Sequence, residues 1–386
     1  MIYIDFRECV PSKYGKFHGG GNYGKRYLRI LKEHFTKLTV FIPTDFEPTS
    51  EEDKDLLVNA NIQLVKIETS NNIKMEQDNA ILFIPLLPTR RFNSINIIKK
   101  NNPNAKVFLT IHGTRYLDSK YDKYDKYYQQ GLNYFAYAIS TRISRFIGKI
   151  IYKHTFKTQI PKYDKIFTVS NDSLQKIVAM AKPQYIKPFY QGSNNFSTAE
   201  YDISKKENYI LFVNANRKEK NFLRTLEAFL AFKKHDTSNL KLYVTGMNNT
   251  VLKNLLRYKK IDAHLMQKHV TFFDYISFSE YNSLFEKCKF LLYTSKTEGF
   301  GLPLLEACSK GCLILSSWIT ATPEVLGSSL VYVNPYDIDS IKNGICTMVK
   351  LCNNPDNYAT ISKRKSVCAA LIALNDTDFV KEFCYD

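Results

Sequence analysis

Short runs of apolar residues recur along the chain and alternate with segments of helical periodicity. Such runs predict strands that are buried on both faces, as in parallel sheets. They occupy 2–5, 38–42, 62–67, 80–84, 106–111 and 164–170 in the first half, and 208–213, 240–246, 269–273 and 289–293 in the second. The alternation of strands and helices predicts an α/β fold.

Length and polarity divide this pattern into two domains. The chain has 386 residues, enough for roughly two to three domains. The polar stretch 194–206 is the predicted linker between an N-terminal domain, 1–193, and a C-terminal domain, 207–360. Residues 361–386 form a further segment of helical pattern.

Composition narrows the class of protein. With 44% hydrophobic and 24% charged residues, the chain is typical of a globular protein. No run of apolar residues is long enough to predict a membrane-spanning helix, and residues 1–7 are typical of a first strand rather than of a signal peptide. The eight cysteines show no zinc-like or redox CxxC spacing, which favours free thiols in a reducing compartment. A cytoplasmic location is therefore expected.

The most informative stretch runs from Thr297 to Glu306. It follows the apolar run 289–293 and reads Thr-Glu-Gly-Phe-Gly-Leu-Pro-Leu-Leu-Glu. Its glycines allow a ligand to approach the backbone, and Pro303 suits the first turn of a helix. The free N–H groups of a helix start favour an anion, and here the carboxylates of Glu298 and Glu306 flank that position.

Carboxylates repel phosphate, so this arrangement fits a ligand with an anionic centre and hydroxyl groups at both ends. A nucleoside diphosphate sugar has that form; a plain turn with two exposed glutamates is the alternative. The spacing of Glu298 and Glu306, with Gly-Phe-Gly-Leu-Pro between them, resembles the Glu-x7-Glu motif of retaining glycosyltransferases of the group 1 family. The resemblance implies the GT-B fold, in which two Rossmann-like domains have parallel sheets that face each other across a cleft. It implies that the acceptor binds to the N-terminal domain and the nucleotide sugar mainly to the C-terminal domain, and that 361–386 crosses back to the N-terminal domain. It also implies that neither a metal nor a cofactor is needed.

The resemblance assigns roles to residues of the second half. Glu306 would bind the ribose hydroxyls, Glu298 would hold the donor sugar, and the departing phosphate would take the acceptor's proton. The other implied donor contacts are the helix start and a turn near the base: Phe300, Gly301, Leu302, Tyr275 and Ile276.

A basic loop follows the strand 208–213. Its cations, Arg217, Lys218 and Lys220, could stabilise the charge that builds on a leaving diphosphate. A solvated basic loop is the alternative. Lys220 is placed as in the family, but Ala215 stands where its arginine is expected, so either Arg217 reaches in or Lys218 replaces it.

Two features of the first half of the chain are also candidates for the functional site. His112 follows the strand 106–111, at the edge of a parallel sheet where ligands bind. The family resemblance places it against the donor sugar; a structural histidine is the alternative. The glycine run after the first strand resembles a loop that lines the cleft, with Gly20, Gly21 and Asn22 in it, although a flexible turn would look the same.

Residues 120–165 carry ten Lys or Arg against three Asp, interleaved with Tyr, Phe and Ile. This composition is typical of an amphipathic helix on an anionic bilayer. A core helix with a solvated basic face is one alternative, and binding to single-stranded nucleic acid, for which no motif is present, is another. The net charge of +17 fits any acidic partner. Asp337 and Asp339 have the spacing of a metal-binding DxD, but a helix N-cap is favoured.

The sequence thus predicts a metal-independent retaining glycosyltransferase. Its donor would be a UDP- or GDP-sugar, and its acceptor a saccharide, either lipid-linked or part of a cell-surface polysaccharide. It would act in the cytoplasm, at the inner face of a membrane, with no nucleic-acid partner. The alternatives are a non-catalytic polyanion- or nucleic-acid-binding protein on the same scaffold, and a sugar-nucleotide epimerase.

Overall fold

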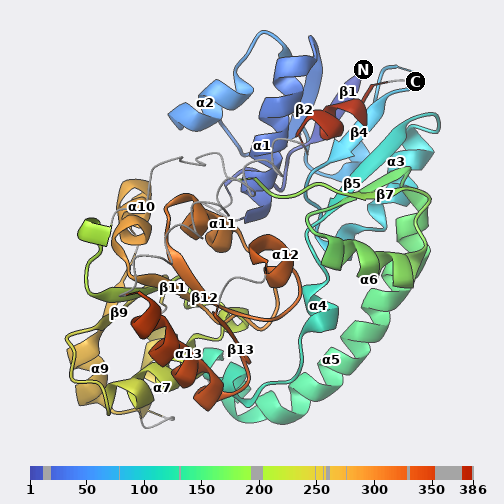
Figure 1. Cartoon of the computed structure of the whole chain (residues 1–386). Coiled ribbons are helices and arrows are strands. Elements are labelled where there is room, and N and C mark those ends of the chain that lie inside the picture. The colour runs from blue at the N-terminus through green and yellow to red at the C-terminus, as the bar shows by residue number, and fades with distance from the viewer. Residues whose placement is uncertain are drawn as a thin grey trace. The chain divides into compact units, whose positions relative to one another are not determined.

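The computed structural model describes residues 1–11, 19–77, 79–129, 132–192, 203–247, 249–254, 256–257, 261–274, 276–327, 331–352 and 376–384. The chain forms two compact units (Figure 1). Unit 1 comprises 1–114, 149–194 and 370–386, and unit 2 comprises 115–148 and 195–369. The units differ from the predicted domain limits chiefly because 115–148 group with the second half of the chain.

Unit 1 is built on a seven-stranded parallel sheet of order β3-β2-β1-β4-β5-β6-β7. Six of its strands confirm the predicted apolar runs. The seventh, β7, was not predicted, because its sequence Ile-Lys-Pro has no apolar run and proline is confined to sheet edges. The strands are β1 (Ile2–Asp5), β2 (Leu38–Ile42), β3 (Ile62–Lys66), β4 (Ile81–Ile84), β5 (Lys106–Ile111), β6 (Lys165–Thr168) and β7 (Ile186–Pro188).

Helices cover both faces of this sheet. One face packs on α3, α6 and the end of α5 through Ile95, Ile177 and Phe156. The other face is aromatic, and there Phe379 and Phe383 of the C-terminal segment pack on rings of β4, β5 and β6. The helices are α1 (Gly19–His34), α2 (Glu51–Leu57), α3 (Ser94–Asn101), α6 (Asn171–Ala181) and the second part of α5 (Leu132–Gln159), with 3-10 turns η1 (Ser70–Asn72), η2 (Thr89–Arg91) and η4 (Ile160–Lys162).

Unit 2 has a six-stranded parallel sheet of order β10-β9-β8-β11-β12-β13, which confirms the second predicted Rossmann-like domain. The order reverses between β8 and β11, so this pair is the topological switch point of the sheet. The strands are β8 (Tyr209–Phe212), β9 (Lys241–Thr245), β10 (Val270–Phe273), β11 (Phe290–Tyr293), β12 (Leu313–Ser317) and β13 (Val331–Val333).

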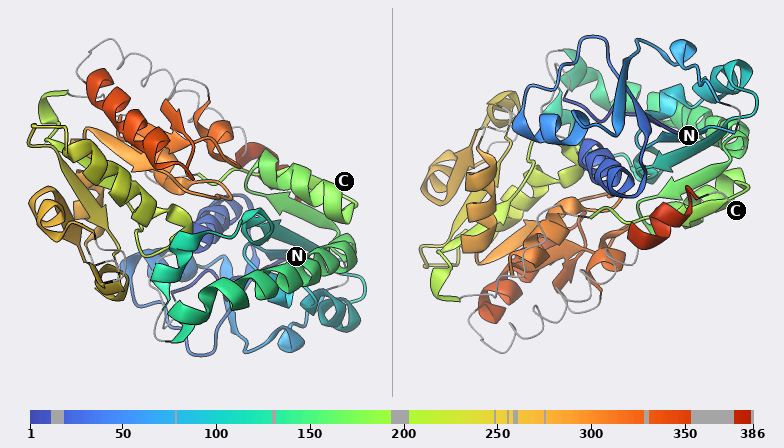
Figure 2. Two further views of the ribbon diagram at one scale, coloured as in Figure 1. Left: turned by 90° about the horizontal axis from the view of Figure 1, so that it is seen from below. Right: turned by 90° about the horizontal axis from the view of Figure 1, so that it is seen from above.

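Apolar helix faces bury both sides of the second sheet. Helices α7 and α13 lie together on one face, and α10 and α11 pack on the other (Figure 2). The helices are α7 (Phe222–Lys233), α8 (Asn249–Asn254), α9 (Ala263–His269), α10 (Phe278–Lys287), α11 (Leu302–Ser309), α12 (Thr322–Leu326) and α13 (Ile338–Leu351), and 3-10 turns occupy η5 (Ile203–Lys205) and η6 (Lys218–Lys220).

The segment 115–148, hereafter the strap, belongs to unit 2. It contains α4 (Arg115–Asp118), η3 (Lys123–Tyr128) and the first part of α5. Its Lys-Tyr-Asp repeat has a period of three, and η3 is a 3-10 helix, in which residues three apart share a face. Tyr124 and Tyr127 therefore both enter the core of unit 2. That 120–165 contacts a membrane surface stays a prediction, and within this repeat Tyr124 and Tyr127 are buried and face the core instead.

Candidate functional site

The switch point of unit 2 brings two predicted loops together. One loop runs from β8 to α7 and contains η6; the other runs from β11 to α11. A backbone hydrogen bond from Lys296 N to the Glu219 carbonyl (2.8 Å) joins them. Asn221, at φ +68°, adds a second link, because its Nδ2 donates to the Thr294 carbonyl at 3.2 Å. Ligands of open α/β sheets bind at this edge.

Lys220 and Glu298 meet at the centre of this edge. Lys220 Nζ donates to Glu298 Oε1 at 2.7 Å and to the Tyr293 hydroxyl at 2.6 Å. Both charged residues are almost fully buried, with 3% and 6% of their surface exposed. The two residues that the sequence singled out for the diphosphate and the donor sugar therefore lie in contact, although 78 positions separate them.

The pair changes both pKa values. Burial alone would raise the pKa of Glu298, but the charge and hydrogen bond of Lys220 outweigh it and hold that pKa at about 2. Burial lowers the pKa of Lys220, an effect that Glu298 opposes and Arg217 reinforces. The site thus holds an ionised carboxylate and a cation poorly shielded by water.

Arg217 lies near this pair but has a partner of its own. Its Nε donates to Glu219 Oε1 at 2.9 Å, and Arg115 lies 3.7 Å from the same oxygen. Burial would lower the pKa of Arg217, yet Glu219 and Glu298 raise it. Arg217 therefore sits within electrostatic reach of the site, held by a carboxylate that a ligand phosphate could displace.

Glu306 is placed by α11. This helix starts after Gly301, whose φ of +106° a side chain would strain, and Pro303 occupies its first turn as predicted. Glu306 Oε2 accepts a hydrogen bond from the Tyr281 hydroxyl of α10 at 3.0 Å. Burial raises the pKa of Glu306, although Tyr281 and Lys220 oppose it. Phe300 is buried beside the helix start.

Three contacts at this site were not predicted. Tyr293 ends the apolar run of β11, and a hydroxyl at the carboxyl end of a switch-point strand was a signal that could have found it. Tyr281 and Thr320 carry no such signal, since both meet their glutamates through tertiary packing. The Thr320 Oγ1 accepts a hydrogen bond from the backbone N–H of Glu298 at 2.9 Å.

The remaining donor-side predictions concern the turn after β10. Ile276 is half-buried there, and Tyr275 lies outside the described residues. Its contact with a nucleotide base stays a prediction.

In unit 1, His112 lies at the end of a strand, as expected, whereas the glycine run is part of a helix. His112 lies at the end of β5, where its Nε2 donates to the Pro85 carbonyl at 2.8 Å, and its ring packs edge-on against Tyr23. The prediction of a glycine loop is wrong for Gly20, Gly21 and Asn22, because α1 begins at Gly19 and includes all three. Close packing favours glycine at position 20 of this helix, since a Cβ there would lie 2.7 Å from the Leu86 side chain.

The acidic pair near the C-terminus has the predicted capping role. Asp337 Oδ1 accepts hydrogen bonds from the N–H groups of Asp339 (2.9 Å) and Ser340 (3.3 Å), which confirms the N-cap of α13. Within the described part of the chain, no three His, Cys, Asp or Glu side chains gather as metal ligands. Metal independence stays a prediction.

Comparison with known proteins assigns the region that holds this site. Residues 193–365 match the family model "Glycosyl transferases group 1". This part of the chain is similar to the group 1 glycosyltransferases. The matched region contains Lys220, Glu298 and Glu306, so the predicted family motif lies inside it.

Curated relatives are similar over part of the chain. The O-antigen chain mannosyltransferase RfbU of Salmonella typhimurium is 31% identical over 211 residues, which cover 53% of this chain and 57% of the relative. The O-antigen chain mannosyltransferase B of Escherichia coli is 24% identical over 135 residues, 35% of each chain. The chain thus spans about half or less of the length of these relatives.

Solved structures agree in fold. A glycosyltransferase from Rickettsia africae has a TM-score of 0.68 at 16% identity, with 98% of this chain and 96% of that chain covered. An Anabaena protein, Alr3699/HepE, solved with UDP and glucose, has a TM-score of 0.64 at 12% identity, with 99% and 98% covered. At these identities the likeness establishes the fold, which is the predicted GT-B class.

Proposed function

We propose that the chain is a retaining glycosyltransferase that moves a sugar from a nucleoside diphosphate sugar to a saccharide. The observation that carries the proposal is the buried pair of Lys220 and Glu298 at the switch point, with Glu306 on the adjoining helix. In this proposal Lys220 and Arg217 neutralise the diphosphate, Glu306 binds ribose, and Glu298 orients the donor sugar. Catalysis then comes from positioning and from fixed positive charge where the leaving group develops negative charge.

The decisive experiment compares Lys220→Met and Glu306→Gln with Lys234→Met, a control that removes an exposed lysine at the end of α7. Transfer from UDP- and GDP-hexoses to saccharide acceptors is the readout, and the anomeric configuration of the product tests retention. Both site variants should lose transfer while the control keeps it. Near-normal turnover in both site variants would refute the assignment.

The donor is proposed to carry a hexose, and mannose is the first to test because the curated relatives are named as mannosyltransferases. A thermal-shift screen with UDP, GDP and ADP would identify the base, because a ligand that binds only the folded protein raises its stability. The nucleotide with the largest shift should also be the product of the transfer reaction. A protein that acts as a polyanion binder would respond to all three, and equally to heparin.

We also propose that α5 attaches the protein to an anionic membrane surface, where a lipid-linked acceptor would lie. No helix in the described parts of the chain is long and apolar enough to cross a bilayer. However, α5 exposes a stripe of apolar side chains, hereafter the α5 stripe, each between 50% and 69% exposed: Ile143, Phe146, Ile147, Ile150 and Ile151.

The spacing of the α5 stripe, with steps of three and four, keeps it on one face of the helix. Basic residues accompany it along the same helix: Arg142, Lys149, Lys153 and Lys157. An amphipathic helix with these features binds anionic interfaces. The proposal narrows the predicted membrane region from 120–165 to 142–157.

Vesicle flotation tests whether α5 binds an anionic membrane surface. The protein should float with vesicles that contain phosphatidylglycerol and remain below with pure phosphatidylcholine. Replacing Phe146 and Ile150 by Ser should abolish flotation without lowering stability, because both side chains are exposed. Val58→Ser, an exposed apolar position outside α5, is the matched control. Equal flotation of the double variant would refute the proposal.

A further inference from the structure

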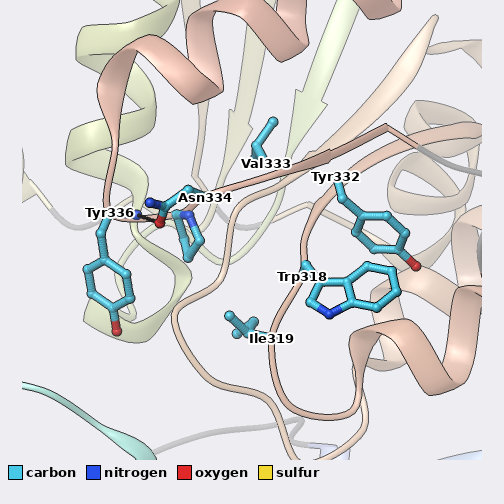
Figure 3. Close-up of a pocket in the computed structure, with 7 residues that line it drawn as sticks. Trp318, Ile319, Tyr332, Val333, Asn334 and Tyr336 are labelled. Atoms are coloured by element: carbon cyan, nitrogen blue, oxygen red, sulfur yellow. Dashed lines mark hydrogen bonds between the residues drawn. The ribbon is translucent and has the colours of Figure 1, made fainter.

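An aromatic hollow of about 360 Å³ lies at the carboxyl ends of β12 and β13. Trp318, Ile319, Tyr332, Asn334, Pro335 and Tyr336 line it (Figure 3). Because all strands of the sheet are parallel, this hollow is at the same edge as Lys220 and Glu298. None of the roles proposed above uses it.

The lining of the hollow selects a class of ligand. Its lining contains no charged side chain, although the chain carries a net charge of +17, so it offers no cation to a phosphate. Trp318 is 61% exposed, and Tyr332 supports it from the side, with ring centroids 4.7 Å apart and planes at 80°. A pyranose has C–H faces that suit such an electron-rich ring and hydroxyls that suit nearby polar atoms.

The hollow is also joined to the proposed donor site. Trp318 and Thr320 belong to one short loop, and Thr320 accepts the backbone N–H of Glu298 at 2.9 Å. Thr320 has φ +41°, a strained conformation for a β-branched residue, and such strain is concentrated at functional sites. On the other side, the Pro335 carbonyl accepts a hydrogen bond at 2.6 Å from Asn221, the neighbour of Lys220.

We propose that the hollow is a saccharide subsite in which one sugar ring of the acceptor stacks on Trp318. The inference rests on the proposed glycosyltransferase function, which supplies the acceptor. Its location implies that the acceptor is longer than one sugar, since one residue must occupy the reaction centre while another reaches the indole. Trp318 would then be a specificity residue rather than a catalytic one.

Trp318 is the only tryptophan in the sequence, so intrinsic indole fluorescence reports directly on this hollow. Titration with α-mannotriose should give a saturable change in emission, and Tyr332→Ala should weaken it. In transfer assays with a soluble trisaccharide acceptor, Trp318→Ala should raise the acceptor KM by roughly tenfold and leave kcat and the donor KM unchanged. Val58→Ala, which shortens an exposed apolar side chain of unit 1, is the control and should change none of these constants.

The failures are distinguishable. If transfer proceeds and Trp318→Ala keeps the wild-type acceptor KM, the subsite is refuted while the glycosyltransferase assignment stands. If the fluorescence responds to phosphatidylglycerol vesicles but to no saccharide, the hollow contacts lipid and the inference is wrong. If no donor and acceptor pair gives transfer, the proposed function fails, and a saturable response to α-mannotriose would still support saccharide binding at Trp318.

Discussion

Replacing Glu298 by Gln should separate the structural role of the buried pair from its role in binding. The substitution keeps the shape of the side chain but leaves Lys220 without its carboxylate. Breaking a buried ion pair in this way costs about 3–5 kcal/mol. At about 2–4 °C per kcal/mol for a domain of this size, the melting temperature should fall by about 6–20 °C. Deprotonation of Lys220 would limit the loss, because burial already lowers its pKa.

The response to a nucleoside diphosphate then reveals what Lys220 binds. If its proper ligand is a phosphate, UDP or GDP supplies the missing negative charge, and the thermal shift on binding should be larger in Glu298→Gln than in the wild type. A nucleotide without sugar is used so that lost contacts between Glu298 and the sugar play no part. Lys220→Met should show almost no shift. The double variant should regain stability without regaining the response, since it leaves neither buried charge without its partner.

Differential scanning fluorimetry with and without saturating nucleotide measures all four proteins. Ligand at a hundred times its dissociation constant stabilises by about 2.7 kcal/mol, which is ample for detection. A full wild-type shift in Lys220→Met would refute the assignment of Lys220 to the diphosphate. An unchanged melting temperature in Glu298→Gln without ligand would refute the buried pair itself.

Three further predictions concern neighbouring charges. Glu219→Gln should free Arg217 and tighten nucleoside diphosphate binding by about two- to fivefold in calorimetry, because the partly exposed pair is worth less than about 1 kcal/mol; weaker binding would contradict this. Asp122→Asn should destabilise unit 2 by about 3–5 kcal/mol, because it breaks a buried ion pair. The wild type should lose stability as the pH falls from about 4 to about 2, because Asp122, with its pKa of about 2, takes up a proton there; the variant should lack this loss. Glu306→Gln should lose nucleotide binding. Its stability relative to the wild type should increase as the pH rises above the normal carboxyl range, because the raised pKa of Glu306 makes the ionised carboxylate of the wild type unfavourable in the folded state. Denaturation of both proteins at pH 4 and pH 8 measures this difference.

Sequence reasoning located most of the sheets because their strands are buried on both faces and therefore consist of apolar runs. It missed β7, which is short and contains a lysine and a proline. It also predicted a loop at Gly20, Gly21 and Asn22, where α1 begins. Glycine has a low helix propensity, so the glycine run gave no indication that a helix begins there.

The charged residues of the site could be predicted because they belong to local sequence motifs. Lys220 and Glu298 each follow a switch-point strand, and Glu306 lies on the helix after the second of these strands, so topology brings them to one edge. The partners of these residues were not predictable. Tyr281 reaches Glu306 from another helix, and no spacing in the sequence encodes that contact.

The strap shows how a segment from the first half of the sequence prepares the site in unit 2. Asp122 accepts a two-pronged hydrogen bond from Arg224 at 2.9 and 3.0 Å, and it also pairs with Lys296 at 2.9 Å. Asp125 pairs with Lys296 as well. Both cations lie next to residues of the proposed donor site. Lys296 precedes Glu298 by two residues, and Arg224 Nη1 donates to the side chain of Asn221, the neighbour of Lys220, at 2.6 Å.

These contacts fix the two loops before any ligand arrives. Asp122 and Asp125 neutralise Lys296 and Arg224, so that the loops can approach each other without repulsion between their cations, and Lys220 remains the buried cation that faces Glu298. Fixed charges stabilise a leaving group only when they need no rearrangement during the reaction. Asp122→Asn should therefore lower kcat in addition to stability, and the loss of kcat should persist at temperatures where the variant is fully folded. A variant that melts earlier but turns over normally when folded would limit the strap to a structural role.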